Sequence, residues 1–336
     1  MHLLIPFANC NSAECQHTLA TLKLPHLDKL LRKLPLVHTD AADESTLSPP
    51  HERALAAAYG INMPNITPDG QAPWGAWHAA QAGHTTAPAD AWAVITPCHW
   101  TVQTSHITMT HPRALNLGGD ESRALLAAMQ PYFAEDGIAL MYHTPTRWLA
   151  RGDVFAGLAT ASPYRVVGGK VDDWLPKAAS AKLLRRLQNE MQMLLYTHPL
   201  TDARAARGLA AVNSFWVSGT GTLPAGFAHL ADGRASTSQA VAVPNALRDA
   251  AIQGDWPAWA QAWQQIDSTE CAALLQAIDM KPDSKTGPTS SATLTLCGER
   301  SAQTYKTGPN GLANRVLRKI RGYFGLQPSS TVLNQL

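Results

Sequence analysis

Apolar side chains recur three and four residues apart along several stretches of the chain, a spacing that places them on one face of an α-helix. The clearest stretch opens at Pro176, continues to about Tyr196 and is stopped by Pro199. Another proline, Pro25, divides a leucine-rich stretch near the N-terminus. These patterns predict helices over 19–34 in two pieces, 120–135, 176–196, 245–253 and 256–280.

Two helices are marked by the residues at their ends. Ser48 suits an N-cap, Pro49 the first helical position and Gly60 the position after the last turn, so we expect a helix between them. In the last predicted helix, Asp267 with Glu270 three residues later is typical of a capping box. We therefore expect that helix to restart at Asp267.

Short runs that alternate or are continuously apolar predict strands over 1–7, 92–96, 106–110, 138–142, 146–149, 212–217 and 293–297. The glycines of Ser218–Gly221 predict a turn after the strand 212–217, and the polar residues 39–50 predict a loop. Two strands, a helix and two strands within 91–150 predict a small sheet covered on one face.

The mixture of strands and helices predicts a mixed α/β (α+β) fold. A length of 336 residues suits about two domains, or one domain with an inserted lobe. We divide the chain into 1–90, the N-terminal strand and helices of a core; 91–170, an α+β lobe; and 171–336, the long helix, the glycine-turn strand and the C-terminal helical part of the core.

Charge and hydropathy exclude several classes of protein. The chain has 27 Lys and Arg against 25 Asp and Glu, a net charge of +2, which is too small a surplus for a protein that coats nucleic acid. No apolar run is long enough for a membrane span. The N-terminus lacks the basic region of a signal peptide, so we expect a cytoplasmic protein. The five cysteines are scattered, which is typical of buried thiols and offers no metal motif.

The candidate chemistry gathers between residues 162 and 224. Arg165 and Lys170 flank the pair Gly168-Gly169, where backbone N–H groups and two cations suit an anion. A simple turn between two strands explains the same residues.

Three further cations follow the long helix: His198, Arg204 and Arg207. They suit a phosphate or carboxylate, although a solvated basic turn remains the alternative. We expect Asn213 and Gly219 to shape the pocket around these cations.

Taken in order, these residues resemble a known family. The series Trp174-Leu175-Pro176, His198-Pro199, Arg204, Gly208, Asn213, Trp216, Gly219, Gly221 and Pro224 is similar to the archaeal-type cofactor-independent phosphoglycerate mutases, over residues 162–227. The whole chain resembles the RpfE-type regulatory proteins, or putative phosphoglycerate mutases, of proteobacteria. That resemblance rests on Cys98-His99-Trp100, Glu135-Asp136-Gly137, Arg147-Trp148-Leu149, Arg186–Glu190, Gln192-Met193-Leu194, Val212–Trp216 and Leu296–Arg300.

The resemblance implies an alkaline-phosphatase-like core with a smaller inserted α+β lobe. In the mutases it also implies two divalent cations, a serine nucleophile and a metal-binding Asp at the end of the first strand. This chain departs from that pattern. Its first strand offers no Asp, the first being Asp28, and His229 is the only His beyond Pro224. We therefore expect a degenerate core with no catalytic residue, no metal site and no cofactor.

Three functions remain open. The first is a non-metal regulatory or binding protein whose basic pocket takes a small phosphorylated or carboxylated acid. The second is an active phosphoglycerate mutase, interconverting 2- and 3-phosphoglycerate, or a related phosphohydrolase. The third is an interaction protein that binds a protein partner through a basic amphipathic helix at 309–324. We favour the first, and expect no nucleic acid partner and no membrane span.

Overall fold

The computed structural model describes residues 1–61, 67–84, 87, 89–224, 227, 241–279, 292–307 and 328–336. The chain forms two compact units. Unit 1 consists of Met1–Glu44, Pro50–Ala58 and Ser238–Leu336, and unit 2 of Ser45–Pro49 and Tyr59–Thr237. The predicted boundaries after residues 90 and 170 both fall within unit 2.

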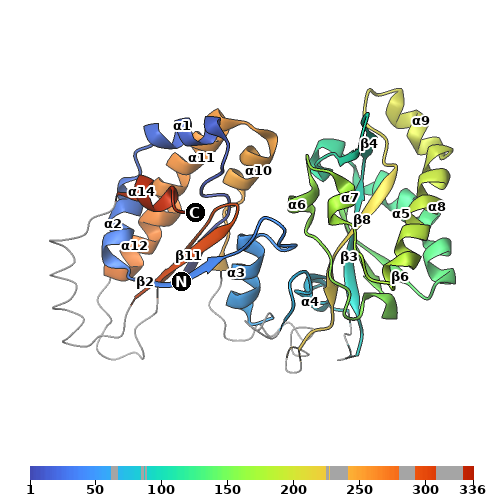
Figure 1. The fold of residues 1–336 in the computed structure, drawn as a ribbon, viewed down its shortest axis with the longest axis horizontal. Coiled ribbons are helices and arrows are strands. Elements are labelled where there is room, and N and C mark those ends of the chain that lie inside the picture. Colours follow the sequence, from blue (N-terminus) through green and yellow to red (C-terminus); the bar gives the residue numbers. More distant parts are fainter. Residues whose placement is uncertain are drawn as a thin grey trace. The chain divides into compact units, whose positions relative to one another are not determined.

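Unit 1 is built on a mixed five-stranded sheet with the order β2-β11-β10-β1-β9 (Figure 1). The strand β1 is parallel to both of its neighbours, β10 and β9, whereas β11 is antiparallel to β10 and β2. Parallel pairing places the carboxyl ends of β1 and β10 at the same edge of the sheet. The strands are β1 (His2–Ile5), β2 (Leu36–Ala41), β9 (Val241–Ala242), β10 (Thr293–Cys297) and β11 (Ser301–Lys306).

Helices cover both faces of this sheet. Both faces are apolar, because successive apolar side chains of β1 point in opposite directions. Leu3 and Ile5 belong to the larger core, with leucines of α1 and α2 and the tryptophans of α11. Leu4 belongs to a smaller cluster with Ala54 and Leu55 of α3. The helices are α1 (Ala13–Thr21), α2 (Pro25–Lys33), α3 (Pro50–Tyr59, its last residue in unit 2), α10 (Ala246–Gln253), α11 (Trp256–Ile266), α12 (Ala272–Asp279) and α14 (Ser329–Leu333).

The expected helix restart at Asp267 is wrong. A π-helical turn, Asp267–Cys271, joins α11 to α12 without a break. The Asp267 carboxylate instead accepts hydrogen bonds from the backbone N–H groups of His26 and Leu27, at 3.2 and 2.8 Å. It therefore caps α2, whose first turn begins with Pro25 and has no side-chain cap of its own.

Unit 2 contains an antiparallel sheet with the order β6-β7-β3-β8 and a separate two-stranded ribbon, β4-β5. The strands are β3 (Trp92–Cys98), β4 (Trp100–Val102), β5 (Ile107–Met109), β6 (Ala139–Thr144), β7 (Arg147–Arg151) and β8 (Ser214–Gly221). The α-helices are α4 (Trp74–Gln81), α5 (Gly119–Glu135), α6 (Pro163–Val166), α7 (Val171–Trp174), α8 (Ala181–Tyr196) and α9 (Pro199–Ala205), with 3₁₀ turns at Pro112–Leu115 and Asp153–Phe155.

The sheet of unit 2 is covered on two faces, not one as expected. Phe215 and Val217 of β8 pack with α5 and α8, while Trp216 between them packs with residues of α6 and α7. Figure 1 shows α5 and α8 on one side of β8 and β3, with α6 and α7 on the other. The predicted strand 106–110 also lies outside this sheet, because β8 takes the place beside β3 and β5 pairs with β4.

The strands β8 and β2 correct two further predictions, the glycine turn at Ser218–Gly221 and the loop at 39–50. The glycine turn is part of β8: Ser218 and Gly221 both pair with β3, and Gly219, with a φ of +61°, lies in the irregularity of the register between them. A Cβ atom at Gly219 would lie 2.7 Å from the Cβ of Trp74, so only glycine allows α4 to approach here. Residues 39–41 belong to β2, an exposed edge strand whose polar side chains resemble those of a loop.

The remaining outcomes concern the ends of the predicted elements. The long helix α8 begins at Ala181, five residues after Pro176. Within the described ranges, no helix is both long and apolar enough to cross a bilayer. The predicted partner-binding helix at 309–324 lies outside the residues that the structure describes.

Candidate functional site

Polar side chains gather at the carboxyl ends of β1 and β10 in unit 1. The chain turns sharply after β1, where Phe7 adopts a φ of +53°, an uncommon conformation for a residue with a side chain. The Ala8 N–H then donates to the Cys297 carbonyl at 2.7 Å, which joins the two strand ends. We call the side chains that follow these ends, Asn9, Cys10, Cys15, Gln16 and Glu299, the β1 edge.

Amide groups occupy the centre of the β1 edge. Asn9 is 3% exposed, and its Oδ1 accepts a hydrogen bond from Gln16 Nε2 at 2.9 Å. The same Gln16 nitrogen donates to the Cys10 carbonyl at 2.7 Å. At the surface, Asn11 Nδ2 donates to Glu299 Oε2 at 2.7 Å. The buried part of the edge is thus held by neutral hydrogen bonds.

Two thiols adjoin these amides. The side chains of Cys10 and Cys15 are hydrogen-bonded to each other, and Cys15 Sγ lies 4.0 Å from Asn9 Oδ1. The hydrogen bond to Cys15, followed by burial, raises the pKa of the Cys10 thiol. The hydrogen bond from Cys10 lowers the pKa of Cys15, although burial acts in the opposite direction.

The donor set at the β1 edge does not fit the pair of divalent cations that the resemblance implies. Such cations take carboxylate and imidazole ligands, several for each ion. Here the buried donors are an amide oxygen, which already accepts from Gln16, and two thiols. Across the described ranges, no group of three or more His, Cys, Asp or Glu side chains is placed to hold a metal ion.

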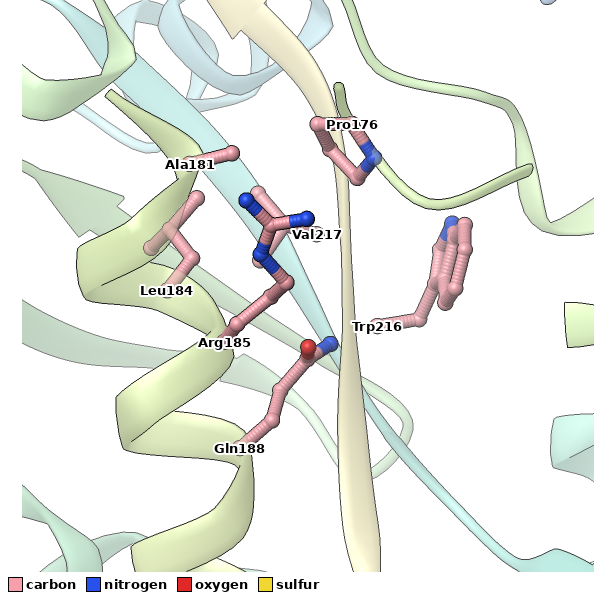
Figure 2. A pocket seen from close by; sticks show the side chains of 7 residues that line it. All are labelled: Pro176, Ala181, Leu184, Arg185, Gln188, Trp216 and Val217. Atoms are coloured by element: carbon pink, nitrogen blue, oxygen red, sulfur yellow. The ribbon is translucent and has the colours of Figure 1, made fainter. Parts of the chain in front are cut away.

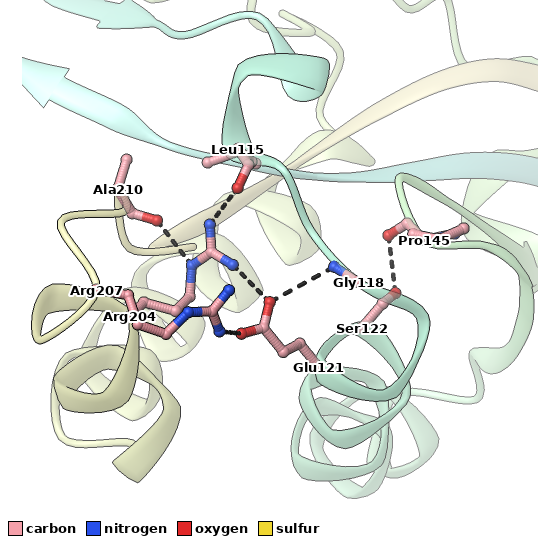
Figure 3. A network of polar contacts seen from close by, with 8 residues as sticks. All are labelled: Leu115, Gly118, Glu121, Ser122, Pro145, Arg204, Arg207 and Ala210. Atoms are coloured by element: carbon pink, nitrogen blue, oxygen red, sulfur yellow. Dashed lines mark hydrogen bonds and ion pairs between the residues drawn. The ribbon is translucent and has the colours of Figure 1, made fainter.

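In unit 2, three charged side chains form a network around Glu121 in the first turn of α5 (Figure 3). One carboxylate oxygen accepts from Arg204 Nη1 at 2.7 Å and the other from Arg207 Nη1 at 2.5 Å. Arg204 also donates from Nε to the Ala210 carbonyl at 2.8 Å and from Nη2 to the Leu115 carbonyl. We call Glu121, Arg204 and Arg207 the Glu121 network.

The two arginines of the Glu121 network have different surroundings. Arg204 is 1% exposed, and its guanidinium is occupied by the carboxylate and two backbone carbonyls, whereas the Arg207 side chain is 56% exposed. Burial by itself would raise the pKa of Glu121, but the hydrogen bonds from Arg207 and the Gly118 N–H and the two positive charges outweigh it and lower the pKa. The network contains two positive charges and one negative charge, so one positive charge is in excess. Of the two arginines, Arg207 is the one exposed to solvent.

The other predicted site residues lie on separate elements. His198 caps α9, its Nδ1 accepting from the Leu200 N–H at 3.2 Å. Asn213 bridges to β4, its side chain bonding both the N–H and the carbonyl of Trp100 at 2.7 and 2.9 Å. Gly219 lies in β8 against α4.

Arg165 and Lys170 lie on the other side of the sheet from α9, in α6 and just before α7 (Figure 1). The glycine pair between them is engaged with the backbone: the Gly168 N–H donates to the Met109 carbonyl and the Gly169 N–H to the Val166 carbonyl. Of the seven predicted residues, the structure brings Arg204 and Arg207 together on one carboxylate.

A small pocket adjoins β8, the edge strand of the sheet in unit 2 (Figure 2). Arg185 and Gln188 extend from α8 toward β8, which carries Trp216. Gln188 Nε2 donates to the Phe215 carbonyl at 3.2 Å, and Trp216 Nε1 donates to the Ala161 carbonyl at 2.8 Å. The cavity volume is about 10 Å³, enough for about one water molecule. A phosphorylated acid does not fit it in this conformation.

Several polar residues of these sites were missed by the sequence reasoning. Glu121 was treated only as part of a helix N-terminus, and Asn9 and Gln16 were not considered. Cys10 and Cys15 stand five residues apart just after the predicted strand 1–7, a signal that the absence of a CxxC motif obscured.

Comparisons with known proteins give sequence matches to one kind of enzyme. No family model matches the sequence. Over 125 residues the chain is 24% identical to the 2,3-bisphosphoglycerate-independent phosphoglycerate mutase of Methanosarcina mazei, a match that covers 37% of this chain and 32% of that enzyme. Over 68 residues it is 32% identical to a probable enzyme of the same name from Geobacter sulfurreducens, covering 20% of this chain and 17% of the relative. The matches span a third or less of these curated relatives.

Solved structures were also compared with the whole chain. A cofactor-independent phosphoglycerate mutase from Thermoplasma acidophilum has a TM-score of 0.37 at 14% identity, covering 93% of this chain and 90% of that one. A protein from Pyrococcus horikoshii has a TM-score of 0.47 at 14% identity, covering 93% and 88%. The alkaline-phosphatase-like core and the RpfE-type relationship stay predictions. The sequence matches support a narrower statement: this mixed α/β chain has weak homology to the cofactor-independent phosphoglycerate mutases.

Proposed function

We propose that the chain is a regulatory or binding protein, related to cofactor-independent phosphoglycerate mutases, that takes a small phosphorylated or carboxylated acid without metal-dependent turnover. The observation that supports this is the neutral hydrogen bonding at the β1 edge. Asn9, buried after β1, pairs its amide oxygen with Gln16 where the resemblance implies a metal-binding Asp. Phosphoryl transfer between two metal ions needs anionic ligands to hold those ions.

The proposed anion-binding residues remain Arg165, Lys170, His198, Arg204, Arg207, Asn213 and Gly219, but we give them different parts because they lie on separate elements. His198 and Arg207 stand at opposite ends of α9, which spans about 10 Å at the usual rise per residue. We assign the contact with a small acid to one of these two ends. We therefore take Arg207, which carries the exposed positive charge of the Glu121 network, as the anion contact on this side, with Arg204 as the residue that positions Glu121.

A substitution series tests this assignment. Arg207→Ala is expected to weaken the binding of 3-phosphoglycerate about tenfold or more, because a charge-assisted hydrogen bond is lost. Arg123→Ala is the matched control, since Arg123 is similarly exposed and pairs with Asp120 on the same helix as Glu121. Titration calorimetry supplies the affinities. Equal affinities for the two variants would contradict the role of Arg207.

An activity assay tests the proposed function as a whole. We expect 3-phosphoglycerate to raise the melting temperature, with a stabilisation of about 2.7 kcal/mol at a ligand concentration 100 times Kd. We expect no conversion to 2-phosphoglycerate, with or without added Mn²⁺. Conversion that depends on Mn²⁺ and is abolished by a chelator would contradict the proposal.

The alternative, an active phosphoglycerate mutase or a related phosphohydrolase, is favoured by the names of the two sequence relatives. The same assay decides between the two, because the alternative requires turnover and the proposal requires binding alone. Release of inorganic phosphate from 3-phosphoglycerate, measured in parallel, would identify the phosphohydrolase form of the alternative.

A further inference from the structure

Two of the five cysteines lie together at the β1 edge. Cys10 comes five residues after the end of β1, and Cys15 lies in the first turn of α1. Both are buried, at 4% and 0% exposure, and their thiols are hydrogen-bonded to each other. A disulfide requires its two sulfur atoms to lie about 2.05 Å apart. Contacts through Asn9 and Gln16 hold the segments that carry Cys10 and Cys15 against each other.

The backbone on either side of this pair is held in place. Ser12 caps α1, its Oγ accepting from the Cys15 N–H at 3.1 Å. Gln16, the residue after Cys15, donates its side-chain N–H to the Cys10 carbonyl at 2.7 Å. These contacts tie the loop to the first turn of α1 close to both thiols. The dithiol is therefore positioned by its surroundings and does not depend on a chance encounter between two mobile segments.

The two thiols are also chemically unequal. Cys15 lies in the first turn of a helix, which favours its thiolate, and the hydrogen bond from Cys10 lowers its pKa, although burial and the charge of Glu299 act in the opposite direction. The pKa of Cys10 is raised, so Cys10 keeps its proton. An acidic thiol next to a protonated one is the arrangement of an attacking and a resolving cysteine.

The other three cysteines provide an internal contrast. Cys98, Cys271 and Cys297 are buried, and burial is the leading cause that raises the pKa of each. Beyond burial, the groups that shift these three pKa values are carboxylates, an arginine, a tryptophan and a serine. Thiols of this kind remain protonated and unreactive at neutral pH.

We propose that Cys10 and Cys15 form a reversible dithiol–disulfide pair at the carboxyl end of β1, with a hydroperoxide as the oxidant. The Cys15 sulfur attacks one oxygen of hydrogen peroxide, the O–O bond breaks, and the released hydroxide takes up a proton to leave as water. Cys15 is then a sulfenic acid. The Cys10 sulfur attacks Cys15 Sγ, the S–O bond breaks, and the departing hydroxide takes the Cys10 proton and leaves as a second water.

Two electrons pass from the two thiols to the peroxide, and a dithiol reductant reverses the change by thiol–disulfide exchange. A small uncharged peroxide suits thiols that lie beneath a surface loop better than a bulky disulfide does. The Cys15 thiol donates to Asn9 Oδ1 over 4.0 Å, and a disulfide has no S–H to donate, so the oxidation state alters the hydrogen bonding of the β1 edge. This inference does not depend on the proposed function, since it involves no phosphorylated ligand.

The unmodified chain provides the first test. After exposure to hydrogen peroxide, remaining thiols are alkylated and each cysteine peptide is measured by mass spectrometry. We expect alkylation of Cys10 and Cys15 to fall together by about tenfold, while Cys98, Cys271 and Cys297 change less than about twofold. Cys10 and Cys15 share one tryptic peptide, which should be lighter by two hydrogen atoms, and dithiothreitol should restore both thiols. Loss at the other three cysteines at the same rate, or full alkylation of the pair, would overturn the proposal.

Two variants test the order of attack. In Cys10→Ser, the sulfenic acid at Cys15 cannot be resolved, so dimedone should label Cys15 after peroxide treatment. In Cys15→Ser, Cys10 should stay a thiol. Cys271→Ser, another buried cysteine of unit 1, is the matched control and should leave the Cys10–Cys15 disulfide unchanged. Dimedone labelling of Cys10 in Cys15→Ser at the same rate would overturn the assignment of Cys15 as the attacking thiol. The mapping on the unmodified chain holds even where a variant fails to fold.

Discussion

The β1 edge of unit 1 and the Glu121 network of unit 2 both remove polar side chains from water, but they use different chemistry. At the β1 edge the buried partners are neutral amides and thiols, centred on Asn9 and Gln16. In the Glu121 network a buried guanidinium, Arg204, is matched by a carboxylate and two backbone carbonyls. The neutral site suits the thiol chemistry proposed above, whereas in the charged site the buried Arg204 holds Glu121 and the exposed Arg207 keeps a cation at the surface.

The largest expected effect comes from breaking the charged network. Arg204→Met removes the partner of Glu121 inside the fold and leaves the Leu115 and Ala210 carbonyls without their donor. We expect a loss of about 3–5 kcal/mol in the free energy of unfolding, as for a broken buried pair. Chemical denaturation measures the loss. Arg207→Ala, at the exposed side of the same carboxylate, should lower the free energy of unfolding by less than about 1 kcal/mol. A similar loss in both variants would show that burial does not make Arg204 more important for stability than Arg207.

The next effect comes from placing a charge at the neutral site. Asn9→Asp keeps the acceptor for Gln16 but buries a carboxylate, whose pKa burial raises. The unfolded chain then ionises at a lower pH than the folded one, so the variant should match the parent protein at low pH. It should become less stable as pH rises, by about 2–3 kcal/mol at neutral pH. A pH-independent difference in denaturation midpoints would contradict the neutral character of the β1 edge.

A smaller effect is expected from a single amide hydrogen bond in each unit. Gln16→Met removes the donor to Asn9 and to the Cys10 carbonyl, and Gln188→Met removes the donor to the Phe215 carbonyl. Each should cost about 1–2 kcal/mol, because a buried acceptor is left without its partner. Thermal denaturation compares the two. Only Gln16→Met should also change the rate at which peroxide oxidises the Cys10–Cys15 pair, since Gln188 lies in the other unit.

The smallest expected effect is the pH dependence of Glu121. Its pKa is lowered in the folded state, so the stability that its ionised form contributes is present above the unfolded pKa and is lost as pH falls through the folded one. The gap in stability between the parent protein and Glu121→Gln should therefore narrow below about pH 4.5. We expect the difference in unfolding free energy to narrow by less than about 1 kcal/mol, because Arg207, one of the two partners of the carboxylate, is exposed to solvent. Denaturation curves at several pH values would detect it; a gap that widens on acidification would contradict the assignment.

Elements with a strong local repeat were predictable from the sequence. The helices α5 and α8 and the strand β10 follow directly from apolar spacing, because a buried face repeats every 3.6 or every two residues wherever it packs. Boundaries were less secure: Pro176 was taken as the start of α8, which begins at Ala181. Gly219 resembled a turn because its conformational freedom suits a turn and an irregular strand equally well.

The candidate sites depended on partners far away in the sequence. Asp267 has the local pattern of a capping box, yet its carboxylate serves α2, 240 residues away. Arg204 was recognised as a cation, but its partner Glu121 stands 83 residues earlier, so the ion pair between them could not be predicted from the local sequence. The anion-binding role of the seven predicted residues stays a prediction.

The sequence by itself determined that this is a mixed α/β chain with a small net charge, that its first strand ends without an acidic residue, and that it resembles phosphoglycerate mutases. These properties follow from the composition of the chain, the order of its residues and their short-range spacing. Only the tertiary structure decided that Cys10 meets Cys15 beside Asn9 and that Arg204 and Arg207 share Glu121. Hydrogen bonds and ion pairs act over about 3 Å, so they are settled by how strands and helices pack, which no local pattern specifies.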